Sequence, residues 1–328
     1  MYNTAVTEKK TISKTTDKWL MPFILVTSLF FLWGLAYGLL DVLNKHFQES
    51  LNITKARSTL LQVAYFGAYF LVALPAGKFM KKFSYKKGII AGLLLYASGA
   101  FMFYPSAQFH SFNFFLLSLF ILASGLACLE TAANPYVTVL GKPETSAFRL
   151  NLSQCFNGVG SFIGPIIGAN LFFSGITAGT DGNMGSVKIV YVIISIIVLI
   201  VAGLFVRTPL PEIKETEEDI KLNGSKESIW RHRHLINAII AQFFYVAAQV
   251  GMAALFINYC TEARNSIDNA KASYLLSISL LLFTIGRFAG TALMKKIAPH
   301  VLLTMYAVAS MVLCLAVWKG NGWVGVYA

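Results

Sequence analysis

Residues 21–44 read MPFILVTSLFFLWGLAYGLLDVLN, and this stretch indicates the class of fold that the rest of the chain repeats. It is almost entirely apolar and contains one charged side chain, Asp41. A helix of about 20 apolar residues crosses the roughly 30 Å of hydrocarbon in a bilayer. A strand of a membrane barrel needs only about ten residues, so a run of this length predicts a membrane-spanning helix.

Similar apolar runs recur along the whole chain. We expect further spans over residues 57–80, 86–104, 111–139, 145–174, 187–206, 235–259, 271–294 and 300–318, with a tenth beginning near Trp323. Hydrophobic residues make up 56% of the 328 positions and charged residues 13%, against roughly 25% charged in soluble domains. The sequence therefore predicts an all-α, multi-pass protein of the inner (plasma) membrane.

The net charge of +12 is concentrated in alternate loops. Of the 27 Lys and Arg residues, 19 lie in the N-terminal segment, in residues 78–87, at Lys142 and Arg149, in residues 207–233 and at Lys295 and Lys296. Alternate loops lie on one side of a membrane, and cytoplasmic loops are enriched in Lys and Arg, so this pattern predicts a cytoplasmic N-terminus. Membrane topology accounts for the excess of Lys and Arg over Asp and Glu, and no nucleic-acid partner is expected.

The stretch 207–234 is highly charged with mixed sign and divides the chain. We expect a cytoplasmic tail over residues 1–20, a six-helix bundle over 21–206, a cytoplasmic linker over 207–234 and a partial second bundle over 235–328. An internal repeat supports this division, since PAGKFMKKFSYKKGI follows the second span and FAGTALMKKIAPHVLL follows the eighth. The first and seventh spans also align, with Gly38 over Gly251.

Two carboxyl groups lie well inside predicted spans, Asp41 in the first and Glu130 in the fourth. Ionisable groups in hydrocarbon cost several kcal/mol unless they are paired or hydrated, so such residues are candidates for function. Desolvation disfavours the charged form, which brings proton exchange near neutral pH within reach. The structural alternative is that each carboxyl group is buried, neutral and hydrogen-bonded.

Amide and aromatic side chains accompany these carboxyl groups. Asn134 follows Glu130 at i+4, and the fifth span has an amide stripe of Asn151, Gln154 and Asn157. Amides in membrane helices often join helices, but this stripe favours the wall of a polar cavity that binds sugar hydroxyls. Two further candidates for sugar binding are Tyr37 in the first span, which could stack on a sugar ring or equally serve in ordinary packing, and Gln249 in the seventh.

The remaining features give no sign of catalysis, ATP binding or metal binding. Arg287 in the eighth span is interpreted as snorkelling or capping the cytoplasmic end of its helix. No GxSxG, HExxH or P-loop motif occurs, so we expect neither an enzyme nor ATP-driven pumping. The five His residues form no metal-binding pattern, and we expect no metal and no cofactor, with protons as the coupling ion.

Several long blocks resemble one known family. These are FFLWGLAYGLLDVLNKHFQ, YFGAYFLVALPAGKFMKKFSYKKGI, CLETAANPYVTVLG followed by FRLNLSQCFN, and GRFAGTALMKKIAPH. They look like the L-fucose permease family of proton-coupled sugar symporters, within the major facilitator superfamily. The resemblance implies two six-helix bundles that rock about a sugar site, with Asp41 and Glu130 as proton-coupling carboxyl groups. It also implies that Glu130 meets the sugar together with Gln154 and Asn157.

The resemblance leaves the sugar and the length of the protein as open points. The family has an amide-rich turn before the first-span Asp, where this chain has Tyr37, Gly38 and Leu40, so glucose, galactose or an amino sugar stay open beside fucose. About nine spans are present of twelve expected, so we expect a C-terminally truncated form or fragment that does not transport alone. The alternative function is a non-transporting membrane sugar sensor, and we expect a monomer in either case.

Overall fold

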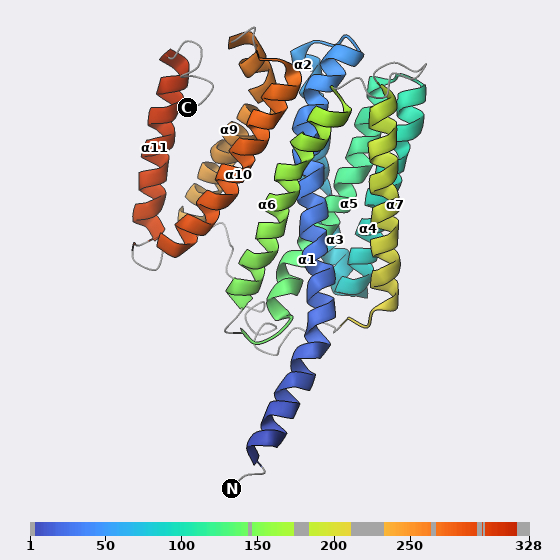
Figure 1. Cartoon of the computed structure of the whole chain (residues 1–328), viewed down its shortest axis with the longest axis vertical. Helices are drawn as coiled ribbons and strands as arrows, with labels where there is room; N and C mark the ends of the chain where they lie inside the picture. Colours follow the sequence, from blue (N-terminus) through green and yellow to red (C-terminus); the bar gives the residue numbers. More distant parts are fainter. Residues whose placement is uncertain are drawn as a thin grey trace.

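The computed structural model describes residues 4–143, 146–173, 184–210, 233–263, 267–293, 297 and 299–319. Within these residues every regular element is a helix (Figure 1). In chain order the helices are α1 (Thr4–Ser50), α2 (Lys55–Ser58), α3 (Leu60–Phe83), α4 (Tyr85–Gln108), α5 (Phe112–Val139), α6 (Ser146–Leu171), α7 (Gly185–Arg207), α9 (Arg233–Ala263), α10 (Asn269–Leu293) and α11 (Pro299–Lys319).

The nine predicted spans correspond to nine long helices among the described residues, and the predicted ends lie within six residues of the observed ones except at the start of α1. There the helix already begins at Thr4, within the segment expected to be a tail. Its first turns project beyond the other helices (Figure 1). Most of the predicted linker, the Lys295-Lys296 pair and the predicted span from Trp323 lie outside the described residues.

Among the described residues, eight helices are long and apolar enough to cross a membrane, and the long helix α6 falls short of that hydropathy. Its Asn, Gln, Ser and Gly residues lower its mean hydropathy. It packs against α1 on one side and α10 on the other, so much of its polar surface is turned toward protein. A helix with such a surface is stable in a bilayer only when neighbouring helices satisfy its polar groups.

Helices α1 to α7 form one packed group whose core is apolar. Its main contacts join α1 to α6, α3 to α5, and α4 to both α5 and α7. Large aromatic side chains fill this core, and the rings of Phe103 and Tyr191 stack with their centroids 3.8 Å apart. Gly38 allows α1 to approach α6 closely, because a Cβ there would meet the backbone carbonyl oxygen of Ser161.

Helices α9, α10 and α11 lie on the other side of α1 and α6 (Figure 1). In the part of the chain that the structure describes, α9 contacts α1 and α10 contacts α6, whereas α11 makes little contact with the first group. The most apolar stretch of α9 and that of α11 are each 6% buried, against 67% for α1. Two unequal groups of helices therefore meet along α1 and α6.

Candidate functional site

The two membrane carboxyl groups lie in the packed group of helices. Asp41 on α1 is 2% exposed, and it lies against Gln62 on α3. Glu130 on α5 is partly buried and lies within electrostatic range of Tyr65 and Tyr69, which are also on α3. Helix α3 therefore provides neighbours to both carboxyl groups, although they stand on different helices.

A chain of amide contacts links three helices near Glu130. The Gln154 amide on α6 donates from Nε2 to Oδ1 of Asn134 on α5 at 3.4 Å. Arg287 on α10 donates from Nη1 to Oε1 of Gln154 at 3.3 Å, and its guanidinium lies 4.8 Å from the centre of the Phe283 ring. The interpretation of Arg287 as a snorkelling or end-capping residue is therefore wrong, because its side chain turns toward α6.

These contacts border a cavity of about 650 Å³ between α6, α9, α10 and α11. Asn151, Gln154, Tyr245, Thr284, Arg287 and Tyr306 supply its polar lining, and Cys155, Phe283 and Phe288 are among the others that line it. Amides, hydroxyls and one guanidinium around aromatic rings provide donors, acceptors and apolar faces together. A pocket of this size and chemistry suits a small polar ligand with an apolar face, such as a hexose.

Three other predicted site residues lie differently. Asn157 donates from Nδ2 to the backbone oxygen of Phe30 at 3.2 Å, so this amide joins α6 to α1. Tyr37 lies within electrostatic range of Asp41 and of Tyr245, which places it between the carboxyl group and α9. Gln249 is partly buried on α9, and the described lining of the 650 Å³ cavity does not include it. The sugar-binding roles of all three stay predictions.

A second cavity of about 610 Å³ lies between α3 and α9. Apolar side chains dominate its lining, with Gln62 and Gln242 among the few polar members. Its chemistry offers a sugar few hydrogen bonds, so it is a weaker candidate for the binding site. In the part of the chain that the structure describes, no group of three His, Cys, Asp or Glu side chains could hold a metal ion.

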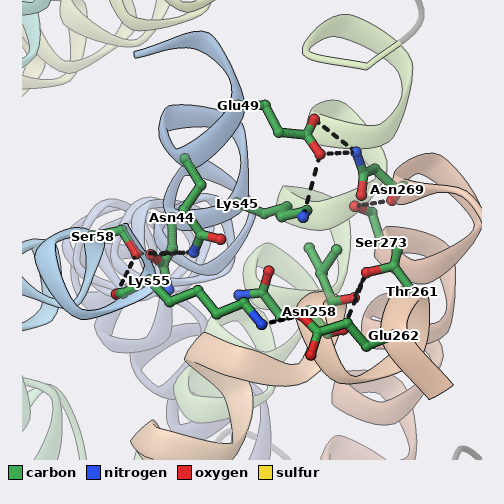
Figure 2. A network of polar contacts seen from close by, with 12 residues as sticks. Asn44, Lys45, Glu49, Lys55, Ser58, Asn258, Thr261, Glu262, Asn269 and Ser273 are labelled. Atoms are coloured by element: carbon green, nitrogen blue, oxygen red, sulfur yellow. Dashed lines mark hydrogen bonds and ion pairs between the residues drawn. The ribbon is translucent and has the colours of Figure 1, made fainter. Parts of the chain in front are cut away.

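A network of polar contacts joins the two groups of helices where α1 ends and α9 and α10 meet (Figure 2). The Asn44 amide donates from Nδ2 to the backbone oxygen of Ala254 at 2.6 Å. Lys55 pairs with Glu262, and Asn269 donates to both carboxylate oxygens of Glu49, at 2.7 and 2.8 Å. We call these three contacts the outer latch, because they lie at the end opposite the N-terminus of α1.

Below the latch, α6 and α10 pack as antiparallel neighbours. The Tyr274 hydroxyl donates to Oδ1 of Asn170 at 2.9 Å, and the Ser277 hydroxyl donates to the backbone oxygen of Phe162. The Arg287–Gln154 contact lies furthest along this line, beside the 650 Å³ cavity. The two groups are thus joined from the outer latch to the middle of the bundle, and the polar cavity lies toward the other end.

Sequence reasoning did not assign several of these residues to the site. Gln62, Tyr65 and Tyr69 follow an i, i+3, i+7 spacing on the second span, which is visible in the sequence as one polar face. Thr284 and Tyr306 carry no such pattern and are identified only by the cavity that they line. The latch residues belong to span ends, where polar side chains are expected whatever their partners.

Comparison with known proteins identifies the family. The model of the Major Facilitator Superfamily matches residues 23–327. The L-fucose-proton symporter of Escherichia coli (strain K12) is 40% identical over 330 residues, which cover 94% of this chain and 75% of that protein. The glucose/galactose transporter of Brucella abortus biovar 1 (strain 9-941) is 35% identical over 306 residues, covering 92% and 74%.

Solved structures agree with this result. The crystal structure of the transporter FucP in the outward conformation is 38% identical, with a TM-score of 0.69 over 94% of this chain and 80% of that chain. The predicted family resemblance and helical membrane fold are therefore confirmed. The chain belongs to the Major Facilitator Superfamily.

Proposed function

We propose that this chain is a proton-coupled symporter for fucose or a related hexose, such as glucose or galactose. The observation that carries the proposal is the 650 Å³ cavity, which combines amides, hydroxyls and aromatic rings beside a bundle that holds two membrane carboxyl groups, Asp41 buried and Glu130 partly buried. The similar proteins named as L-fucose-proton symporters and glucose/galactose transporters support the same class of substrate.

The roles of the site residues follow from their positions. Gln154 borders the cavity and contacts Asn134, so these two amides would hydrogen-bond sugar hydroxyls. Glu130 lies one helical turn from Asn134 and would couple sugar occupancy to its own protonation. Asp41 is more deeply buried and would hold the second exchangeable proton. Asn157, Tyr37 and Gln249 are not part of the described lining, so their proposed contacts with sugar would form in another conformation of the transport cycle.

The conformation supports transport by alternating access. The outer latch closes one end, while the polar cavity lies toward the end where α1 begins. Lys78, Lys81, Lys82, Lys86 and Lys87 lie at that same end, around the junction of α3 and α4. A basic end of this kind faces the cytoplasm, so we assign the structure to an inward-facing state with a cytoplasmic N-terminus.

Membrane vesicles that contain the protein at its full natural length provide the test. We expect counterflow of labelled fucose, glucose or galactose, because exchange requires only that the cavity face each side in turn. Addition of the transported sugar should also alkalinise the outer medium as protons enter with it. Sugar binding without counterflow of any of the three sugars would instead identify a non-transporting sensor, and counterflow without proton movement would identify a facilitator.

A further inference from the structure

A polar stripe on α3 lies between the two carboxyl groups. Gln62, Tyr65 and Tyr69 are spaced i, i+3 and i+7, so they share one face of the helix and extend over about 10 Å of its length. The exposed fractions of Gln62 and Tyr65 are 8% and 1%, and the hydroxyl of Tyr69 is buried. This face is turned into the protein although it contains three polar side chains.

The stripe connects the surroundings of Asp41 to those of Glu130. Gln62 is the neighbour of Asp41, while Tyr65 and Tyr69 both lie within electrostatic range of Glu130. The two tyrosine rings are adjacent, with their centroids 5.3 Å apart. The distance between the carboxyl groups is therefore bridged by side chains of a single helix.

Several polar atoms of this stripe and of Asp41 make no hydrogen bond of good geometry, although Gln62 lies beside Asp41 and Tyr69 beside Tyr65 at close to hydrogen-bond distance. Five atoms are buried without a hydrogen-bond partner among the described residues, namely Oδ2 of Asp41, Nε2 and Oε1 of Gln62, and the hydroxyls of Tyr65 and Tyr69. Each such atom costs about 1–3 kcal/mol if it stays unpaired. The buried hydroxyl of Tyr96, in contrast, donates to the backbone oxygen of Leu32 at 3.2 Å.

A packing role alone does not account for these residues. Phenylalanine would fill the space of Tyr65 and Tyr69 equally well and would bring no unpaired hydroxyl into the core. Buried polar groups without a protein partner usually bind ordered water molecules, and several such groups lie together here. Water molecules between these side chains would satisfy all five atoms and connect them.

We infer that Gln62, Tyr65 and Tyr69 form a hydrated polar track that passes a proton between Asp41 and Glu130. One carboxyl group releases its proton to the nearest water molecule or hydroxyl. Each water molecule or tyrosine hydroxyl along the track accepts one proton and donates another, and the second carboxylate accepts the last, so no charge remains on the track. Gln62 orients water beside Asp41. This inference rests on the proposed symport.

The test separates proton movement from sugar movement. Tyr65→Phe and Tyr69→Phe each remove one hydroxyl oxygen and keep the ring. Gln62→Leu is a third variant, which replaces the amide by an apolar side chain of similar size. In vesicles, sugar counterflow at equal pH needs no net proton transfer, whereas accumulation driven by a proton gradient does. We expect each variant to keep its counterflow and to lose about tenfold or more in proton-driven accumulation, the scale on which proton relays act.

Tyr96→Phe is the matched control, because it removes a buried hydroxyl that already has a protein partner. Its ratio of accumulation to counterflow should equal that of the unchanged protein. Wild-type accumulation in the Tyr65→Phe and Tyr69→Phe double variant would overturn the track. Equal losses of counterflow and accumulation in all three variants would also overturn it, since they would indicate a structural role. Absence of counterflow in the unchanged protein would refute the proposed symport itself.

Discussion

Helices α1 to α7 and helices α9 to α11 contain related sequence patterns in different surroundings. The most apolar stretches of α1 and α5 are 67% and 61% buried, whereas those of α9 and α11 are each 6% buried. The aligned glycines show the contrast, because Gly38 abuts α6 while Gly251 has no atom of the described structure within 4 Å of a Cβ built on it. A repeat in sequence therefore predicts a common helix but not a common environment.

The two groups of helices therefore supply different parts of the candidate site. The packed group holds Asp41, Glu130 and the amide of Gln154 in fixed positions. The second group supplies Arg287 and Tyr245 to the cavity and one side of the outer latch. A movement of the second group would break the contacts at the latch and along α6 and leave the packing within the first group intact, so the chemistry can stay in place while access changes.

The carboxyl groups provide the strongest test of this division. Asp41→Asn and Glu130→Gln keep the shape of each side chain and remove its exchangeable proton. Sugar-driven proton uptake should fall about a hundredfold or more in each, because general acid–base groups of this kind contribute on that scale. Asp268→Asn removes an exposed carboxyl group outside the site and should retain uptake. Coupled uptake at the wild-type rate in both site variants would refute the assignment.

The aligned glycines test the contrast in packing. A Cβ at position 38 would collide with the carbonyl oxygen of Ser161 and lie 3.1 Å from Cδ of Pro165. Gly38→Ala should therefore destabilise the protein by about 1–3 kcal/mol. Gly251→Ala meets no atom of the described residues and should be neutral or stabilising by up to about 1 kcal/mol. Thermal unfolding in detergent measures both, and equal shifts would contradict the proposed difference between the groups.

The buried part of the outer latch should influence which end is open. Asn44→Ala removes the 2.6 Å hydrogen bond to the backbone oxygen of Ala254, which joins α1 to α9 in the closed state. The net loss of one such hydrogen bond is about 0.5–1.5 kcal/mol, so the outward-open population should rise about two- to tenfold. Native Cys155 lines the cavity and can report the change through labelling by an impermeant maleimide added outside the cell.

The same labelling measured in a Cys155→Ser background gives the signal that is due to the other cysteines. Subtraction of that signal isolates the label on Cys155. Unchanged outside labelling in Asn44→Ala would show that this bond does not hold the outer end closed.

The exposed ion pair of the latch should have the smallest effect. The side chains of Lys55 and Glu262 are 52% and 60% exposed, so their attraction is worth at most about 1 kcal/mol. Lys55→Glu should raise outside labelling of Cys155 a few-fold, and the added Glu262→Lys change should restore it. High salt should weaken the effect, because it screens exposed charges. Failure of the double reversal to restore low labelling would show that these two residues act independently.

The sequence alone determined the class of fold and most of the candidate chemistry. Each span could be predicted by itself because a bilayer requires about 20 apolar residues in a row, which is a local property. Asp41 and Glu130 could be identified because carboxyl groups are rare in such runs. Long motif blocks indicated the family, and the family match confirms that prediction.

Tertiary structure decided which polar side chains meet. Asn134, Gln154 and Arg287 come from three helices, and their contacts depend on how each helix is rotated about its axis. The same rotation turns Asn157 toward Phe30, although the sequence places it on the same stripe as Gln154. Lys55 and Glu262 are 207 residues apart and pair only because two helix groups meet. Rotation and register are set by packing between helices, which no single span encodes.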